Sequence, residues 1–146
     1  MGMLDQNTKL ATAQAVTSTG DTASTNVYDF GSAATADAAL VGEELWINAL
    51  VDTTATSGGA ATVQVVLQDS ADNVTFADVL SGPVVALAQL KAGTPLLLTE
   101  SPVGLRRYFR VAWRVGTEAL TAGKFTAFVS MGVQANIARP SGFTVA

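Results

Sequence analysis

The feature that most constrains the fold of this chain is an alternation of apolar and polar residues with a period of two. It begins near Asn26 and is interrupted by turn-forming residues about every ten positions. Successive side chains of a β-strand point to opposite faces, so this period favours strands over helices. Gly, Pro, Asn, Asp and Ser gather between the runs, which is typical of a β-sandwich or jelly roll. The sequence therefore predicts an all-β fold.

Individual runs mark the expected strands. They cover residues 26–31, 44–52, 61–69, 74–80, 96–100, 105–115 and 124–133. The window 84–91, VVALAQLK, fits a short helix and a strand about equally well, and both alternatives stay open. The connection over 115–123, VGTEALTAG, has the composition of a hairpin-like turn.

The N-terminal segment, residues 1–26, differs from the rest of the chain. It is rich in Ala, Thr, Ser and Gln and contains few large apolar side chains. Such a segment has little surface to bury by itself, so we expect an extended arm that becomes ordered on a partner surface. A short helix over 8–15 is the alternative, but isolated helices of that length are weak. The predicted organisation is an arm, residues 1–26, followed by one β domain, residues 27–146.

The surface of this protein is expected to carry unusually little charge. Apolar residues make up 49 % of the 146 residues and charged residues 14 %, against a usual charged share of about 25 %. Burial of much of the surface between subunits would explain the shortage. No apolar run reaches the roughly 18 residues of a membrane span, and the start lacks the apolar centre of a signal peptide. We therefore expect synthesis in a cytosol and no membrane partner.

The residue inventory excludes several kinds of chemistry. The chain has no Cys and no His, which removes thiolate nucleophiles, Cys/His zinc sites and Ser-His-Asp triads. The segment 116–125 lacks the spacing of a P-loop, and 69–73 lacks the Gly and Glu that close an EF-hand. We predict no catalytic, cofactor-binding or metal-binding residues, no cofactor and no enzyme activity. A hydrolase built on a pair of carboxylates is a weaker alternative.

One basic stretch stands out in this acidic chain, whose net charge is -4. Residues 105–115, LRRYFRVAWRV, contain four of the eight positive charges, and the alternation places Arg106, Tyr108, Arg110 and Arg114 on one face. These side chains suit a ladder with carboxylates of neighbouring strands, a protein interface, or a platform for single-stranded nucleic acid. The negative net charge and the absence of a second basic cluster argue against nucleic acid. We favour the interface.

The two tryptophans differ in their expected positions. Trp113 shares the parity of the apolar residues around it, so it is expected in the core, whereas Trp46 is the better candidate for exposure. An exposed Trp can stack on a sugar. A carbohydrate-binding jelly-roll module of a virion or tail protein is therefore the main alternative function. The complete predicted interface set is Arg106, Tyr108, Arg110, Arg114 and Trp46.

Three blocks of the sequence resemble the capsid cement (decoration) proteins of tailed bacteriophages, of the type first recognised in a Bordetella phage. They are LDQNTKLATAQAVTSTGDTASTNVYDFG, GEELWINALVDTTATSGGAATVQVVLQDSADNVTF and PVGLRRYFRVAWRVGTEALTAGKFTAFVSMGVQ. Together these blocks cover most of the chain in the family's order and spacing.

The resemblance implies a jelly roll that assembles as a homotrimer. It implies a position on the outer surface of the phage head, at three-fold and quasi-three-fold sites, where the trimer clamps the major capsid protein against the pressure of packaged DNA. It also implies no enzyme activity and no cofactor. The expected partners are the major capsid protein and the chain itself, with no nucleic acid and no membrane. The protein would be made in the host bacterial cytoplasm.

Overall fold

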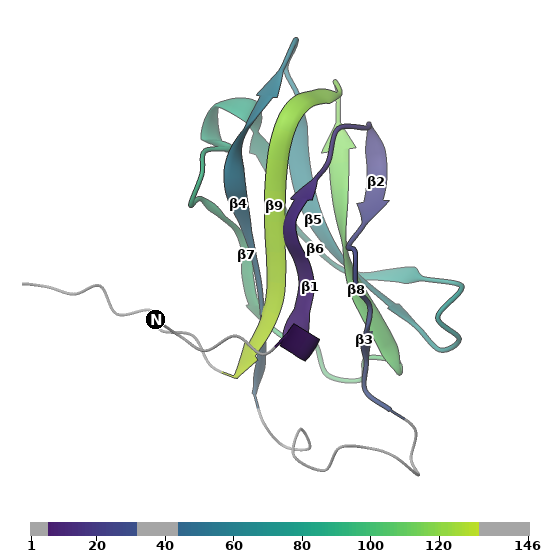
Figure 1. Cartoon of the computed structure of the whole chain (residues 1–146). Helices are drawn as coiled ribbons and strands as arrows, with labels where there is room; N and C mark the ends of the chain where they lie inside the picture. The colour runs from purple at the N-terminus through teal and green to yellow at the C-terminus, as the bar shows by residue number, and fades with distance from the viewer. Residues whose placement is uncertain (1–5, 32–43, 132–146) are drawn as a thin grey trace, which may run out of the picture.

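The computed structural model of this protein describes residues 6–31 and 44–131 as two antiparallel β-sheets packed face to face (Figure 1). The first sheet has the order β1-β9-β4-β7, with β1 (Lys9–Ala15), β9 (Leu120–Met131), β4 (Leu45–Ser57) and β7 (Pro95–Glu100). The second has the order β2-β8-β5-β6, with β2 (Gly20–Ala23), β8 (Tyr108–Gly116), β5 (Thr62–Ser70) and β6 (Ala77–Ala86). A short strand, β3 (Tyr28–Asp29), also pairs with β8. The predicted all-β sandwich is confirmed.

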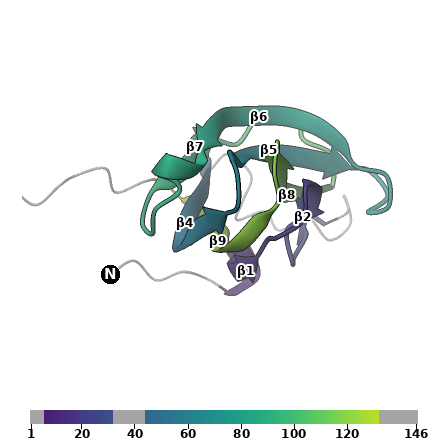
Figure 2. The same ribbon diagram turned by 90° about the horizontal axis from the view of Figure 1, so that it is seen from above.

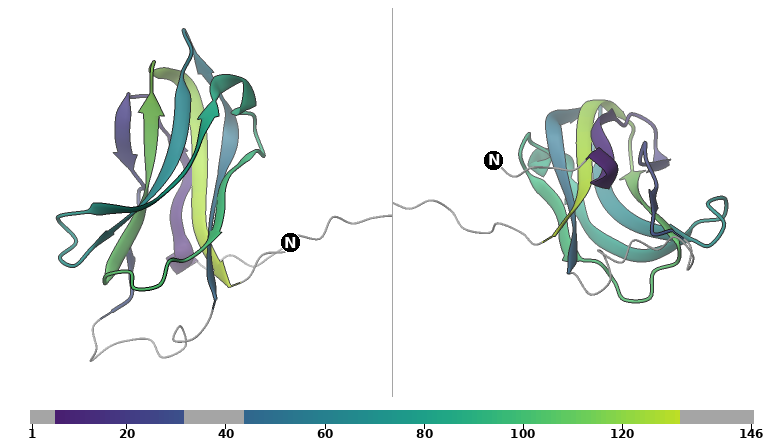
Figure 3. Two further views of the ribbon diagram at one scale, coloured as in Figure 1. Left: turned by 180° about the vertical axis from the view of Figure 1, so that it is seen from behind. Right: turned by 60° about the horizontal axis from the view of Figure 1, so that its bottom comes forward.

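Most consecutive strands lie in opposite sheets, and β5 and β6 form a hairpin within one sheet. This order is consistent with the expected jelly roll, in which a chain winds through two Greek keys. The edge strands β6 and β7 contact each other at one side of the sandwich (Figure 2). The turn between β5 and β6 projects from the body of the sandwich in both views of Figure 3.

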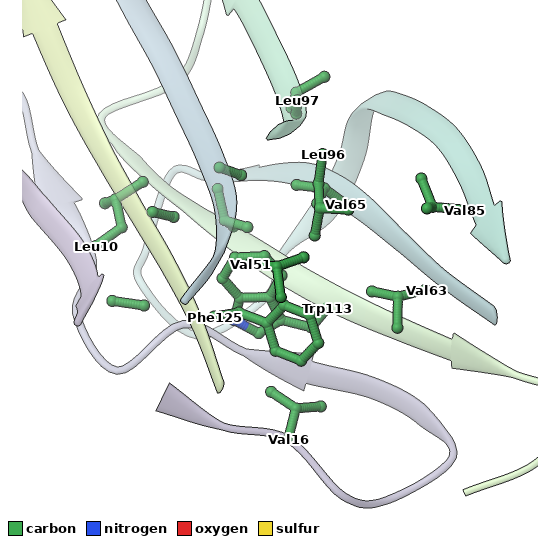
Figure 4. Packing of buried hydrophobic residues seen from close by; sticks show 14 of the residues in the cluster. Leu10, Val16, Val51, Val63, Val65, Val85, Leu96, Leu97, Trp113 and Phe125 are labelled. Carbon is green, nitrogen blue, oxygen red and sulfur yellow. The ribbon is translucent and has the colours of Figure 1, made fainter. Parts of the chain in front are cut away.

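The connection between β8 and β9 is not the hairpin-like turn that its composition indicates. β8 pairs with β2, β3 and β5, while β9 pairs with β1 and β4, so the chain crosses from one sheet to the other. The crossing lets both strands bury their aromatic residues against each other. The rings of Trp113 on β8 and Phe125 on β9 have centroids 5.2 Å apart between the sheets (Figure 4).

The core follows the alternation of the strands. In β4 the buried residues are Leu45, Ile47, Ala49, Val51 and Ala55, and in β8 they are Phe109, Val111, Ala112, Trp113 and Val115. Ala112 is the exception to the alternation, and its small side chain needs little room between the neighbouring strands. β5 is buried on both faces from Val65 to Ser70, and on its outward face Gln68 is hydrogen-bonded to the side chains of Arg110 and Asp78. These faces remove a large apolar area from water, which is the main stabilisation of such a sandwich.

The N-terminal segment is part of the sandwich, so the arm expected over residues 1–26 is wrong for the part that the structure describes. β1 pairs with β9 and β2 pairs with β8, which places the segment at the edge of both sheets. Leu10 and Val16 are fully buried, and the side chain of Gln14 accepts a hydrogen bond from Nε1 of Trp113 at 3.2 Å. Edge strands need few large side chains, because β8 and β9 already supply the core and the backbone partners. Residues 1–5 lie outside the described residues.

The ambiguous window 84–91 contains the end of a strand and a single turn. Residues 84–86 belong to β6, and η3 (Leu87–Gln89) is one turn of 3-10 helix. A second such turn, η1 (Gln6–Thr8), precedes β1, where the alternative helix over 8–15 does not form. β6 begins at Ala77, three residues later than expected, because Asp72 caps the preceding turn by accepting the backbone N–H groups of Val74 and Thr75, both at 2.9 Å. Across the described ranges, no helix has the length and hydropathy to cross a bilayer.

Candidate functional site

The arginine stretch occupies the outward face of β8 and the loop that precedes it. Phe109, Val111, Trp113 and Val115 point into the core, so Tyr108, Arg110 and Arg114 point outward. The predicted division of this strand into an apolar face and a basic face is confirmed. Arg106 and Arg107 precede the first residue of the strand and are exposed. Arg107 would fall on the inward side if the alternation of β8 were continued backwards, but it lies outside the strand and is not buried.

Arg114 links three strands of the second sheet. Its Nε and Nη2 donate to the two carboxylate oxygens of Asp21 on β2, both at 2.7 Å. Nη2 also donates to Oδ2 of Asp78 on β6 at 2.8 Å. Hydrogen bonds from Arg114 and Gln68 hold the pKa of Asp78 below its ordinary value, and the two carboxylates raise the pKa of Arg114. This is a cross-strand ladder within one chain.

Arg106 fastens the loop before β8 to the end of β5. Its backbone N–H and its Nε donate to the carboxylate of Asp69 at 3.0 and 2.9 Å, and its Nη2 donates both to that carboxylate and to the carbonyl of Asp69. The Asp69 side chain is only 9 % exposed. The hydrogen bond from the Arg106 guanidinium lowers the pKa of this carboxyl. The pair therefore holds the entry to β8 in place.

Arg107 makes a similar pair at the other side of β8. Its Nε and Nη2 donate to the two oxygens of Asp29 on β3 at 2.8 and 2.9 Å. The Asp29 carboxylate also accepts the backbone N–H of Gly31, and these bonds lower its pKa. Because both side chains are about two-fifths exposed, solvent screens this pair strongly.

Arg110 differs from the other three arginines because no carboxylate of the described residues lies within salt-bridge distance of it. Its Nε donates to Oε1 of Gln68 at 3.0 Å, and Nε2 of Gln68 donates to Asp78 at 2.8 Å. Its guanidinium carbon lies 3.8 Å from the centroid of the Phe76 ring, a cation–π distance. Partial burial lowers the pKa of Arg110. Its charge is thus held in position but not directly neutralised.

The predicted interface residues do not form a single site. Arg106, Tyr108, Arg110 and Arg114 belong to the second sheet, whereas Trp46 lies on the outward side of β4 in the first. Trp46 and Leu50 are half-buried there, on a face that includes Phe128 of β9 and the 48 % exposed Leu98 of β7. Asn48 of β4 is paired in register with Leu98 on one side and with Phe128 on the other. The sandwich therefore has one charge-paired outer face and one mixed outer face, on which Trp46 stands in register with the polar Glu100 and Ser130.

Several partners in the charged network carried no usable signal in the sequence. Asp69 and Asp78 stand at or near strand ends, where a solvated turn residue is the ordinary interpretation. Asp21 lies in the segment expected to be an arm. These aspartates lie near the arginines only because of the order of the strands in the sheet. That order could not be predicted from the sequence, so the acidic partners could not be identified from it either. The described ranges contain no group of three or more acidic residues arranged to hold a metal ion.

The lowered carboxyl pKa values predict acid sensitivity. The pKa values of Asp29, Asp69 and Asp78 are lowered, chiefly by arginine, and that of Asp72 is lowered to about 2 by its turn hydrogen bonds. A carboxyl whose pKa is lower in the folded state stabilises the fold fully above about pH 4 and loses this contribution as the pH falls towards about 2. We expect the melting temperature to be flat from about pH 7 to pH 5 and to fall below about pH 4.

Thermal unfolding followed by circular dichroism across this pH range measures the effect. Asp78→Asn should lower the melting temperature at neutral pH and show a smaller further loss in acid, while Glu100→Gln on exposed β7 serves as the control. A wild-type melting temperature that is unchanged between about pH 5 and pH 2.5 would contradict the prediction.

The fold and this network define an antiparallel β-sandwich protein with a charge-paired outer face. The chain belongs to the Bbp16 family, whose model matches residues 10–129, from β1 to β9. The family is named in the manner of a Bordetella phage protein, so the chain is a member of a phage protein family. No curated protein matches the chain.

Proposed function

We propose that this chain is a capsid cement (decoration) protein of a tailed phage. It binds the outside of the head as a homotrimer at three-fold and quasi-three-fold sites and clamps neighbouring subunits of the major capsid protein. The observation that carries the proposal is the family match over residues 10–129, which includes both sheets of the sandwich. The protein has no enzyme activity and uses no cofactor. It is made in the host cytoplasm and ends on the outer surface of the virion.

The physical character of the sandwich suits this role. A clamp must keep its shape under load, and the ion pairs of Arg106 and Arg114 tie neighbouring strands and loops of the second sheet together. The low charged fraction and the outward apolar residues of the first sheet, such as Trp46 and Leu98, supply surface for contacts between subunits. The second sheet offers a charged outer face in addition.

The purified protein is expected to be a trimer at micromolar concentration and to co-sediment with undecorated capsids of its phage. Size-exclusion chromatography with light scattering measures the mass, and sedimentation at several salt concentrations measures the binding. A monomeric mass would contradict the predicted trimer but not the binding to capsids. Failure to co-sediment under any condition would contradict the cement function.

A carbohydrate-binding module is the second candidate, and the half-buried Trp46 favours it because its side chain lies on the outward face of β4. Trp113 cannot contribute to stacking, since it is completely buried. A glycan array distinguishes the two functions. Binding of a defined sugar that is lost in Trp46→Ala would support the second candidate.

A further inference from the structure

Arg110 is the one arginine of the 105–115 stretch whose terminal nitrogens make no hydrogen bond with any described residue. Arg106, Arg107 and Arg114 each direct Nη2 at a carboxylate. Within the described part of the chain, the only side-chain hydrogen bond of Arg110 uses Nε. The described side chains include no buried nitrogen or oxygen without a partner, so the terminal nitrogens of Arg110 are accessible to solvent. This guanidinium edge is therefore open.

The guanidinium of Arg110 is nevertheless well ordered by its surroundings. Phe76, in the projecting turn between β5 and β6, covers one face of the group at 3.8 Å. Gln68 holds Nε and is itself held by Asp78. A stacked and anchored guanidinium presents its remaining N–H groups in its own plane, which is the geometry that a carboxylate accepts. Because the side chain is already ordered, a ligand loses less affinity to conformational entropy.

The charges around Arg110 limit the kind of ligand that fits. Asp21 and Asp78 lie on the same face and are bound by Arg114. The charges of Asp21 and Asp78 cancel those of Arg110 and Arg114. This group of four side chains therefore has no net positive charge, although the guanidinium edge of Arg110 is open. A nucleic-acid backbone brings a row of phosphates, which Asp21 and Asp78 would repel. A single carboxylate meets this repulsion only once, and it can pair with the open edge of Arg110.

We propose that Arg110, supported by Phe76 and Gln68, receives an Asp or Glu side chain from the outer surface of the major capsid protein. The proposal rests on the cement function and identifies the contact on this chain. Arg106, Arg107 and Arg114 stabilise the fold instead. Tyr108, one outward position from Arg110 along β8, or about 7 Å, borders the contact.

The test compares binding to undecorated capsids of the phage with thermal stability for a set of variants. Arg110→Ala is expected to weaken capsid binding by at least about tenfold with a melting temperature close to that of the wild type. Arg110→Lys should recover part of the affinity, because a lysine keeps the charge but not the planar fork. Phe76→Leu should weaken binding less than Arg110→Ala, because it removes the stacked ring and leaves the charge. Lys124→Ala, at an exposed position of β9, is the matched control for loss of one positive charge.

The outcomes separate the inference from the function on which it rests. Wild-type protein that does not bind capsids contradicts the cement function. Wild-type binding with unchanged affinity in Arg110→Ala overturns the inference and leaves the function standing. Loss of the trimer in Arg110→Ala assigns the contact to a second copy of this chain and also overturns it. Tight wild-type binding to single-stranded DNA that disappears in Arg110→Ala overturns it in favour of nucleic acid.

Discussion

Replacing Trp113 by alanine is expected to lower the free energy of unfolding by about 3–5 kcal/mol, the range for truncating a large buried aromatic residue. Trp113 is fully buried, packs against Phe125 between the sheets, and donates its indole N–H to Gln14. The substitution leaves a cavity in the core and removes one of the hydrogen bonds of the Gln14 side chain, which still binds the backbone of Ala23 and Thr25. Urea unfolding followed by far-ultraviolet circular dichroism measures the loss.

Trp46→Ala is the matched control, because Trp46 is half-buried on an outward face and its removal opens no internal cavity. We expect a smaller loss of stability for this variant in the isolated protein. Equal effects of the two substitutions would mean that Trp113 does not form the centre of the core.

Deleting residues 1–26 is expected to abolish cooperative folding. The deletion removes β1 and β2, exposes the backbone edges of β9 and β8, and takes Asp21 from Arg114. Burial of Leu10 and Val16 alone contributes roughly 1.5–3 kcal/mol for each side chain. Their sum is a large share of the 5–15 kcal/mol by which a typical domain is stable. Thermal unfolding and one-dimensional NMR spectra of the truncated protein measure the outcome.

Deletion of residues 1–5 is the control, since it leaves both edge strands in place, and it should preserve the cooperative transition. If the protein lacking residues 1–26 instead melts like the wild type and loses only its association with partners, the segment acts as an arm after all. The two deletions therefore distinguish an integral edge from a docking extension.

The ion-pair pattern changes how the arginine stretch should be understood. A row of Arg and Tyr is typical of a protein interface, yet Arg106, Arg107 and Arg114 are occupied by carboxylates of their own chain. Substituting them would disturb the positions of β2, β3 and β6 before it affected a partner. Any binding defect in those variants should therefore be judged against their stability. Arg110 is the position at which binding and stability are expected to separate.

The outer face of the first sheet, where apolar and polar side chains are mixed, is the other surface on which the proposed function depends. Trp46, Leu50 and Phe128 are each half-buried, and the exposed Leu98 extends the face to the edge strand β7. Such a face suits contacts between copies of this chain, whereas the charged face suits a partner with complementary groups. These two faces lie on opposite sides of the sandwich.

The sequence by itself determined most of the strands from β3 onward and, in β4 and β8, the side that is buried. In β4 and β8 the alternation predicts the inward positions, including Phe109 and Trp113, because the geometry of a strand places every second residue on one face. Only the tertiary structure decided which strands are neighbours. Arg114 and Asp21 are 93 positions apart, and Arg106 and Asp69 are 37 apart. No local pattern encodes such a pairing, because the order of the strands depends on burying the apolar faces of all of them together. The same requirement places Leu10 and Val16 in the core.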